Sequence, residues 1–334
     1  MTDFRRNNFD FLRFAAATAV WYSHCGLFYN LPHTLLYLDM GHIAVGVFFT
    51  ISGYFITASY DRKKALLPFA WHRALRIFPA LIVVVFLSVF LLGPLVTLLS
   101  VQDYFSNPQT YSYLKLLLIL PFLHNPPDVL PGVFTHFRLP VVNAPLYTLF
   151  FEILCYGAVA LFGVLQMLRP RIMFALIIGL WLGIFMNPAL QPNPIFKPVD
   201  NTIEFFIFFA AGSILYLLRD KIPLNFRYFI MAALLLLISV LLHASLLFDL
   251  SFAYMVIYVG FLKLPALHNF GKHGDFSYGI YLYAWPIQQA LAETLNYRNY
   301  PLFVCVSFLL ILSCAALSWN LIEKPALAHK NKVH

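Results

Sequence analysis

The sequence predicts an all-α integral membrane protein, a polytopic bundle of about ten transmembrane helices. Of the 334 residues, 61% are hydrophobic and only 11% are charged, whereas about 25% of residues are charged in an ordinary soluble domain. Apolar runs of about 20 residues, the length that crosses a bilayer as a helix, recur along the chain. The runs are continuous and do not alternate residue by residue, which favours helices over the strands of a membrane barrel.

The expected spans follow one another with short polar links and one long one. A basic segment with five lysines and arginines separates the second span from the third. The spans cover about residues 9–28, 42–59, 79–99, 146–168, 172–185, 201–218, 228–247, 249–262, 276–295 and 301–321.

The long link is a proline-rich stretch of about residues 100–145 between the third and fourth spans. Its apolar piece 114–123 is too short to cross, so we expect it at the membrane interface or packed on the bundle. No internal repeat is visible. We expect one integral-membrane domain over residues 1–334, without an additional soluble domain.

The distribution of positive charge predicts the orientation. With the N-terminus inside, 17 of the 22 lysines and arginines fall in inner segments and 4 in outer ones. Arg13 lies within the first span. Because positive charge accumulates on the cytoplasmic side, both termini are expected to be cytoplasmic.

The net charge of +8 does not indicate nucleic-acid binding, because the basic residues stand singly or in pairs between apolar runs. The four cysteines lie inside apolar segments without CxxC spacing, so we expect buried small hydrophobes, no disulfide framework and no metal site. The first apolar run lacks a small-x-small cleavage site and is taken as a retained helix, not a signal peptide.

That first run carries Asp10, Arg13 and His24. Charged residues inside a spanning helix are costly and usually face a polar interior or a functional site. Arg13 and His24 are eleven residues apart, so they lie within roughly 20° of one helix face and about 16 Å apart along the axis. In the predicted orientation, Asp10 and Arg13 lie near the inner surface and His24 near the outer one.

Glu152 in the fourth span is expected at a depth similar to that of His24, since this span runs inward from the outer link. A carboxylate beside an imidazole can orient its tautomer and stabilise its protonated form, as a general base requires.

An inner polar group comprises Asp10, Arg13, Arg73, Arg76 and Glu323. Cytoplasmic arginines suit a phosphate-bearing ligand, because the guanidinium pairs with two phosphate oxygens at once. Midway across the second span, Ser52 and Gly53 would let another helix or a thin ligand approach closely.

Each of these features also has a structural interpretation. Arg73 and Arg76 could be anchors to lipid headgroups, and Asp10 and Arg13 could simply pair with each other. His24 and Glu152 could be hydrogen-bonding residues that join helices. In combination, His24 and Glu152 lie at a similar depth near the outer membrane surface, and the basic residues lie near the inner surface. This layout favours a charged donor in the cytoplasm and an acceptor outside.

Six pieces of the chain, in order, carry a resemblance to a known family. With these pieces, the second of which follows Gly41–His42–Ile43, the chain resembles the membrane-bound acyltransferase family 3, which typically O-acetylates bacterial cell-surface polysaccharides with acyl-coenzyme A. The pieces are FDFLRFAAATAVWYSH, GVFFTISGYFIT, HRALRIFPAL, LYTLFFEILCY, SYGIYLYAWPI and LIEKP.

The resemblance implies that His24 is the catalytic base, with Arg13 and Asp10 essential beside it. It also implies that Arg73 and Arg76 lie on the donor side, and that Glu152, Ser52 and Gly53 belong to the core site.

Two positions depart from the family pattern. Tyr147 stands where the family often has tryptophan, and Ala284 stands where it often has histidine. The second departure leaves His24 as the main candidate base.

The expected function is therefore transfer of an acyl group, most simply acetyl from acetyl-CoA, to a sugar hydroxyl of an envelope glycan such as a lipopolysaccharide O-antigen, capsule or exopolysaccharide. The glycan would be extracytoplasmic or lipid-linked, and the protein would lie in a bacterial inner membrane among its lipids. Direct transfer and a two-step route through an acyl-enzyme both remain open. The alternative is a proton-coupled transporter or flippase for an envelope precursor, since buried acids and bases also form proton relays.

Overall fold

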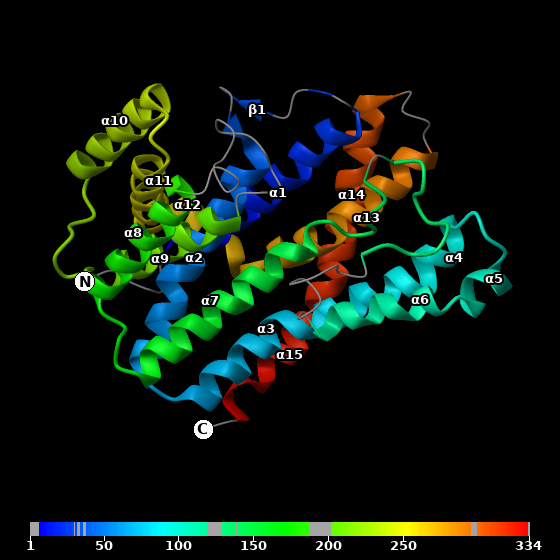
Figure 1. Cartoon of the computed structure of the whole chain (residues 1–334), viewed down its shortest axis with the longest axis horizontal. Coiled ribbons are helices and arrows are strands. Elements are labelled where there is room, and N and C mark those ends of the chain that lie inside the picture. Colours follow the sequence, from blue (N-terminus) through cyan, green and yellow to red (C-terminus); the bar gives the residue numbers. More distant parts are fainter. Residues whose placement is uncertain are drawn as a thin grey trace. The chain divides into compact units, whose positions relative to one another are not determined.

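The computed structural model is almost entirely helical (Figure 1). It describes residues 7–29, 31, 34–35, 38–118, 128–137, 139–186, 202–294 and 299–332. Five of the basic residues used to predict the orientation lie outside these ranges, as does the second half of the apolar piece 114–123. The five are Arg5, Arg6, Arg138, Lys197 and Arg298.

Fifteen α-helices are formed by the described residues, and the longest coincide with the apolar runs. The helices are α1 (Phe9–Phe28), α2 (Met40–Lys63), α3 (Leu66–Leu87), α4 (Gly93–Val96), α5 (Val101–Ser106), α6 (Pro108–Ser112), α7 (Leu146–Val164), α8 (Pro170–Met186), α9 (Thr202–Leu217), α10 (Phe226–Leu242), α11 (Ser245–Phe261), α12 (Pro265–His268), α13 (Ser277–Thr294), α14 (Tyr300–Ser318) and α15 (Lys324–Ala328).

Shorter elements connect these helices. The two-residue strands β1 (Thr34–Leu35) and β2 (Leu38–Asp39) pair antiparallel just before α2. Asp39 then caps α2 by accepting the backbone N–H groups of Gly41 and His42. The remaining elements are π-helical segments at Ser88–Leu92 and Trp319–Glu323 and 3₁₀ segments at Tyr113–Leu118, Phe270–His273 and His329–Lys332.

Four helical stretches in the described chain are long and apolar enough to cross a membrane, or five if the pair Ser245–Phe261 and Pro265–Lys272, bent by 86°, forms one span. The helical membrane class is thus confirmed, whereas the count of ten spans and the orientation of the termini stay predictions. Three further apolar helices fall below the length of about 20 residues that a span needs. The four are Met40–Lys63, Leu66–Val96, Leu146–Val164 and Tyr300–Ala328, and the three are Pro170–Gly183, Ile203–Leu217 and Phe226–Leu242.

Helix α3 begins earlier than the predicted third span. The prediction begins the span at Pro79, yet the helix begins at Leu66 and continues through this proline. Proline removes one backbone hydrogen bond from a helix, but in an apolar environment the other backbone groups have no partners except those within the helix. Arg73 and Arg76 are therefore helical residues on one face, one turn apart.

Two compact units are formed by the chain. Unit 1 comprises Met1–Val20, Thr34–Phe69 and Phe151–His273, and unit 2 comprises Trp21–His33, Ala70–Phe150 and Gly274–His334. The chain passes from one unit to the other five times, three of them within a helix, in α1, α3 and α7. The single domain over residues 1–334 stays a prediction.

Unit 1 has its core around α9, which packs on α2, α8 and α11. The contact between α2 and α9 is close because each helix offers a glycine to the other. A Cβ on Gly53 would lie 1.9 Å from the carbonyl oxygen of Phe209, and one on Gly212 would lie 2.1 Å from that of Thr50. The two helices are also joined by a hydrogen bond, in which Thr57 Oγ1 on α2 donates to Ser213 Oγ on α9 at 2.9 Å.

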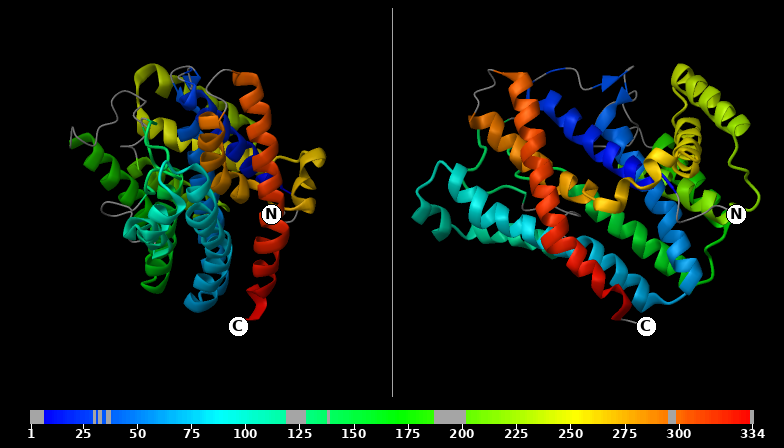
Figure 2. Two further views of the ribbon diagram at one scale, coloured as in Figure 1. Left: turned by 90° about the vertical axis from the view of Figure 1, so that its right-hand side faces the viewer. Right: turned by 180° about the vertical axis from the view of Figure 1, so that it is seen from behind.

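Unit 2 is built on α13 and α14, which pack closely where Gly279 faces Ala315. Figure 2 shows α14 and α15 as one continuous helical stretch, joined through the π-helical segment Trp319–Glu323. Helix α13 is also tied to its neighbours by hydrogen bonds. The Tyr278 hydroxyl donates to the carbonyl of Ile77 at 2.8 Å, and Asn143 Nδ2 donates to that of Leu282 at 2.9 Å.

Candidate active site

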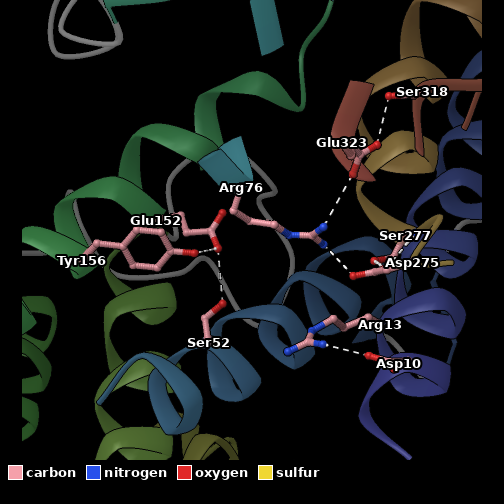
Figure 3. Close-up of polar contacts among 10 residues, drawn as sticks. All are labelled: Asp10, Arg13, Ser52, Arg76, Glu152, Tyr156, Asp275, Ser277, Ser318 and Glu323. Carbon is pink, nitrogen blue, oxygen red and sulfur yellow. Dashed lines mark hydrogen bonds and ion pairs between the residues drawn. The ribbon is translucent and has the colours of Figure 1, made fainter. Parts of the chain in front are cut away.

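Glu152 is the centre of a hydrogen-bonded group in unit 1 (Figure 3). Ser52 Oγ on α2 donates to Glu152 Oε1 at 3.3 Å, and the Tyr156 hydroxyl, one turn further along α7, donates to the same oxygen. Tyr156 is buried, while Ser52 and Glu152 are partly exposed. Two donors on one oxygen hold the carboxylate in a fixed orientation. The structure thus brings together two predicted residues, Ser52 and Glu152, and adds Tyr156.

Gly53, the neighbour of Ser52, faces α9. The Phe209 carbonyl occupies the space that a side chain would need. Of the two partners that the sequence allows for this glycine, a helix or a thin ligand, the structure shows the helix. Gly53 therefore sets the position of Ser52 through the packing of α2.

Asp10 and Arg13 form the predicted pair at the start of α1. Arg13 Nη1 lies 3.2 Å from Asp10 Oδ1, as Figure 3 shows. The pair is partly exposed and has specific surroundings in unit 1. The guanidinium of Arg13 stacks on the Phe55 ring at 5.8 Å, and Asp10 lies so close to Gly271 that a Cβ there would come within 2.1 Å of Asp10 Oδ2.

His24 belongs to the last turns of α1, in unit 2. Its ring meets the Trp285 ring edge to face, with centroids 4.9 Å apart and planes at 85°. Trp285 is held in turn by its indole N–H, which donates to the carbonyl of Val141 at 3.0 Å. One turn after Ala284, Gln288 Nε2 donates to the carbonyl of Trp21 at 2.9 Å and to Cys25 Sγ at 3.0 Å.

These contacts fix the end of α1 on α13 and orient the His24 ring. The sequence has Ala284 in place of an imidazole, and the next residue, Trp285, is the aromatic neighbour of His24. Gln288 contacts Trp21 and Cys25 at the same end of α1. Neither Trp285 nor Gln288 was predicted, although the SYGIYLYAWPI piece that contains Trp285 is part of the resemblance.

Arg76 is the centre of an ion-pair network in unit 2. Its guanidinium lies between two carboxylates in Figure 3, with Nη2 at 2.6 Å from Asp275 Oδ2 and Nη1 at 3.5 Å from Glu323 Oε2. Glu323 is only 2% exposed, and Ser318 Oγ donates to its other oxygen at 2.9 Å. Arg76 and Glu323, both in the predicted inner group, are thus brought together. Asp275 was not predicted.

His24 and Glu152, predicted to lie at one depth, belong to different units. Their pairing as base and orienting carboxylate stays a prediction. Within its own unit, each has the partners given above.

A further charged group in unit 1 was not predicted. His42 Nε2 on α2 lies 2.7 Å from Glu204 Oε2 on α9, and the His42 ring stacks on Phe205 at 5.1 Å. Asp249 on α11 is buried near Glu204. Two acidic residues inside apolar runs, Glu204 and Asp249, were the available signal for this group.

The cysteines are free thiols. Cys25 and Cys155 are buried as predicted, but Cys305 is exposed and Cys314 is only partly buried. Among the described residues, no group of three or more His, Cys, Asp or Glu side chains is arranged to hold a metal ion.

The comparison with family models decides the family. A model described as an acyltransferase domain, that of acyltransferase family 3, matches residues 6–319. The chain belongs to acyltransferase family 3. The membrane helices, the charged start of α1 and the group around Glu152 are therefore parts of an acyltransferase of this family.

Two relatives extend this result. The chain is 28% identical over 332 residues to an O-acetyl transferase of Shigella phage Sf6, a match that covers 96% of each chain. It is 45% identical over 83 residues to nodulation protein 10 of Rhizobium leguminosarum bv. viciae, a match limited to 23% of each chain. No solved structure matches the chain significantly.

Proposed function

We propose that the protein is a membrane O-acetyltransferase that moves an acetyl group from acetyl-CoA to a sugar hydroxyl of an envelope glycan. The observation that carries this proposal is the match over nearly the whole length to a relative named O-acetyl transferase, within acyltransferase family 3. Candidate acceptors are lipopolysaccharide O-antigen, capsule and exopolysaccharide, presented outside the cytoplasm or on a lipid carrier. The protein would lie in a bacterial inner membrane.

His24 is the proposed general base. An imidazole nitrogen takes the proton of the acceptor hydroxyl as the oxygen attacks the thioester carbonyl. The tetrahedral intermediate then collapses, the carbon–sulfur bond breaks, and the CoA sulfur leaves with the proton that the imidazolium returns. General-base catalysis of this kind contributes about 10²- to 10⁴-fold in rate. The edge-to-face contact with Trp285 supports this role, because it limits the orientations open to the ring.

Glu152 is proposed to be a second catalytic residue. Its carboxylate is held by Ser52 and Tyr156, which suits a group that must keep one orientation during the reaction. Asp10 and Arg13 are proposed to be essential at the inner end of α1, with Arg13 near the donor.

The donor is proposed to enter from the cytoplasm, with its phosphates near Arg73. The ion pairs of Arg76 with Asp275 and Glu323 support a different task for Arg76, which is to hold α3 against the segments that carry the two carboxylates. Arg76 then contributes to donor binding by positioning Arg73, one turn away on α3.

Acyl transfer can be direct, as described, or can pass through an acyl group held for a time on the protein. Single-turnover labelling separates the two routes, because radiolabelled acetyl stays on the protein in the absence of acceptor only if an acyl-enzyme forms.

The experiment that tests the function is incubation of membranes that contain the protein with radiolabelled acetyl-CoA and envelope glycan. Acyl transfer predicts label in ester linkage on the glycan. The alternative, proton-coupled transport or flipping of a precursor, predicts movement of unlabelled glycan precursor with no ester formed, and this result would overturn the proposal.

A further inference from the structure

The C-terminal 3₁₀ segment His329–Lys332 is bound to the beginning of α3 through backbone carbonyls. Trp71 Nε1 donates to the carbonyl of His329 at 3.3 Å, and His72 Nε2 donates to the carbonyl of Lys330 at 3.0 Å. His329 Nδ1 also donates to the carbonyl of Pro325 at 2.9 Å, which fixes the segment to α15. Because all three acceptors are backbone groups, these bonds place the backbone of the segment independently of the Lys330 side chain.

The bond from His72 places Lys330, whose side chain is half-buried, against the residue that precedes Arg73 on α3. The pKa of Lys330 is lowered, first by burial and then by the charges of Arg73 and Arg76. In the part of the chain that the structure describes, no carboxylate pairs with the Lys330 ammonium. Arg76, by contrast, is compensated by Asp275 and Glu323.

A half-buried ammonium beside two guanidinium groups costs free energy unless an anion compensates it. The anion that suits a lysine next to arginines is phosphate, which accepts charge-assisted hydrogen bonds from both side-chain types. Among the described residues no carboxylate fills this role, although two lie near enough to pair with Arg76.

We propose that Lys330, together with Arg73, forms a phosphate-binding site at the junction of α3 and the C-terminal segment, and that its ligand is the phosphate groups of coenzyme A. This inference rests on the proposed function, since it takes the donor to be acetyl-CoA. The C-terminal segment is then part of the donor site, held in place by Trp71 and His72.

The phosphate of a lipid headgroup has the same chemistry, so the source must be distinguished. At a site for a soluble ligand, inorganic pyrophosphate competes with coenzyme A for binding. A site for a lipid headgroup instead keeps anionic lipid bound during purification, and soluble coenzyme A does not displace that lipid.

The test is equilibrium binding of coenzyme A to the purified full-length protein in nanodiscs of zwitterionic lipid. Four proteins are compared, which are the wild type, Lys330→Ala, Lys330→Arg and Lys324→Ala. Lys324 is the matched control, an exposed lysine on neighbouring α15. We expect Lys330→Ala to weaken binding roughly 10-fold, as for loss of a charge-assisted contact, while Lys330→Arg and Lys324→Ala bind within about 2-fold of wild type. Lys330→Gln, which keeps the length of the stem, replaces Lys330→Ala if the latter does not fold.

Unchanged binding by Lys330→Ala, with coenzyme A bound by the wild type, would overturn this inference and leave the proposed function intact. No binding by the wild type would instead contradict the proposed donor. A lipid site would be revealed if Lys330→Ala loses co-purified anionic lipid while its affinity for coenzyme A is unchanged, and this outcome also overturns the inference.

Discussion

At the scale of single residues, the candidate site depends on how each charged group is held. Glu152 receives two hydroxyl donors on one oxygen, from Ser52 and Tyr156. Arg76 forms ion pairs with the nearly fully buried Glu323 and the partly buried Asp275. These two groups lead to different predictions, because the first is proposed to act in the reaction and the second to maintain the fold.

Tyr156→Phe removes one donor from the Glu152 carboxylate and keeps the ring. A hydrogen bond to a charged group contributes about 1.5–3 kcal/mol, so we expect acyl transfer to slow by roughly 10- to 100-fold with little change in thermal stability. The measurement is the rate of acetyl transfer beside the melting temperature. Tyr254→Phe, which removes a hydroxyl bonded to the carbonyl of Pro223 in the same unit, is the control and should retain the wild-type rate. A normal rate in Tyr156→Phe would show that this bond is not needed for the reaction.

Arg76→Met leaves Glu323 and Asp275 without their cation. Removal of one partner of a buried pair costs about 3 kcal/mol, so the melting temperature should fall. In the double variant Arg76→Met/Glu323→Gln, the uncompensated charge of Glu323 is gone and much of the loss should be recovered. The check is thermal unfolding of the four proteins of this cycle in detergent. If Arg76→Met melts like the wild type and only loses affinity for coenzyme A, then Arg76 binds the donor directly.

The sequence predicted several of these residues but not their partners. Asp10, Arg13 and Glu152 stand out because ionisable residues are rare in apolar runs. Ser52 stands out with Gly53 as a pair of small residues, and Arg76 as a member of the basic segment before the third predicted span. The residues that complete each group do not stand out in the sequence. Tyr156 is one of 19 tyrosines and Trp285 one of 5 tryptophans, and Asp275 lies in a polar link between predicted spans. Only packing in three dimensions selects the one tyrosine or tryptophan that meets a charged group.

At the scale of helices, the contact between α2 and α9 positions Ser52. The two backbones come close enough for carbonyl oxygens to occupy the space of a Cβ at Gly53 and Gly212. Small residues permit such approach between membrane helices. The sequence indicated a close approach at Gly53, but it did not identify α9 as the partner, since the match involves a glycine about 160 residues away.

Gly53→Ala should force α2 and α9 apart, because the new methyl group would lie 1.9 Å from the carbonyl oxygen of Phe209. Overpacking of this kind costs about 1–3 kcal/mol. We expect a lower melting temperature together with slower acyl transfer, as Ser52 moves away from Glu152. Gly179→Ala on α8, where a Cβ meets no atom within 4 Å, is the matched control. Equal melting temperatures for the two variants would contradict the close packing.

At the scale of the whole chain, hydropathy predicted the helical membrane class correctly, because continuous apolar runs leave the backbone no alternative to helices in lipid. It predicted spans less well. Helices α8, α9 and α10 are shorter than a straight span requires, and composition alone does not show whether a short apolar helix crosses the membrane, inserts part of the way or lies within the bundle. Helix α3 begins before its predicted start because proline does not end a helix that has no other partner for its backbone.

In the proposed reaction, this member of acyltransferase family 3 transfers acetyl from acetyl-CoA to a glycan hydroxyl with His24 as the base. The most direct test is the initial rate of ester formation by the purified protein in nanodiscs, with radiolabelled acetyl-CoA and envelope glycan. His24→Ala is compared with the wild type and with His136→Ala, a half-exposed histidine. We expect the wild type and His136→Ala to form labelled ester at similar rates, and His24→Ala to be at least about 100-fold slower with an unchanged melting temperature. Ester formation by His24→Ala at the wild-type rate would contradict a role of His24 as the base.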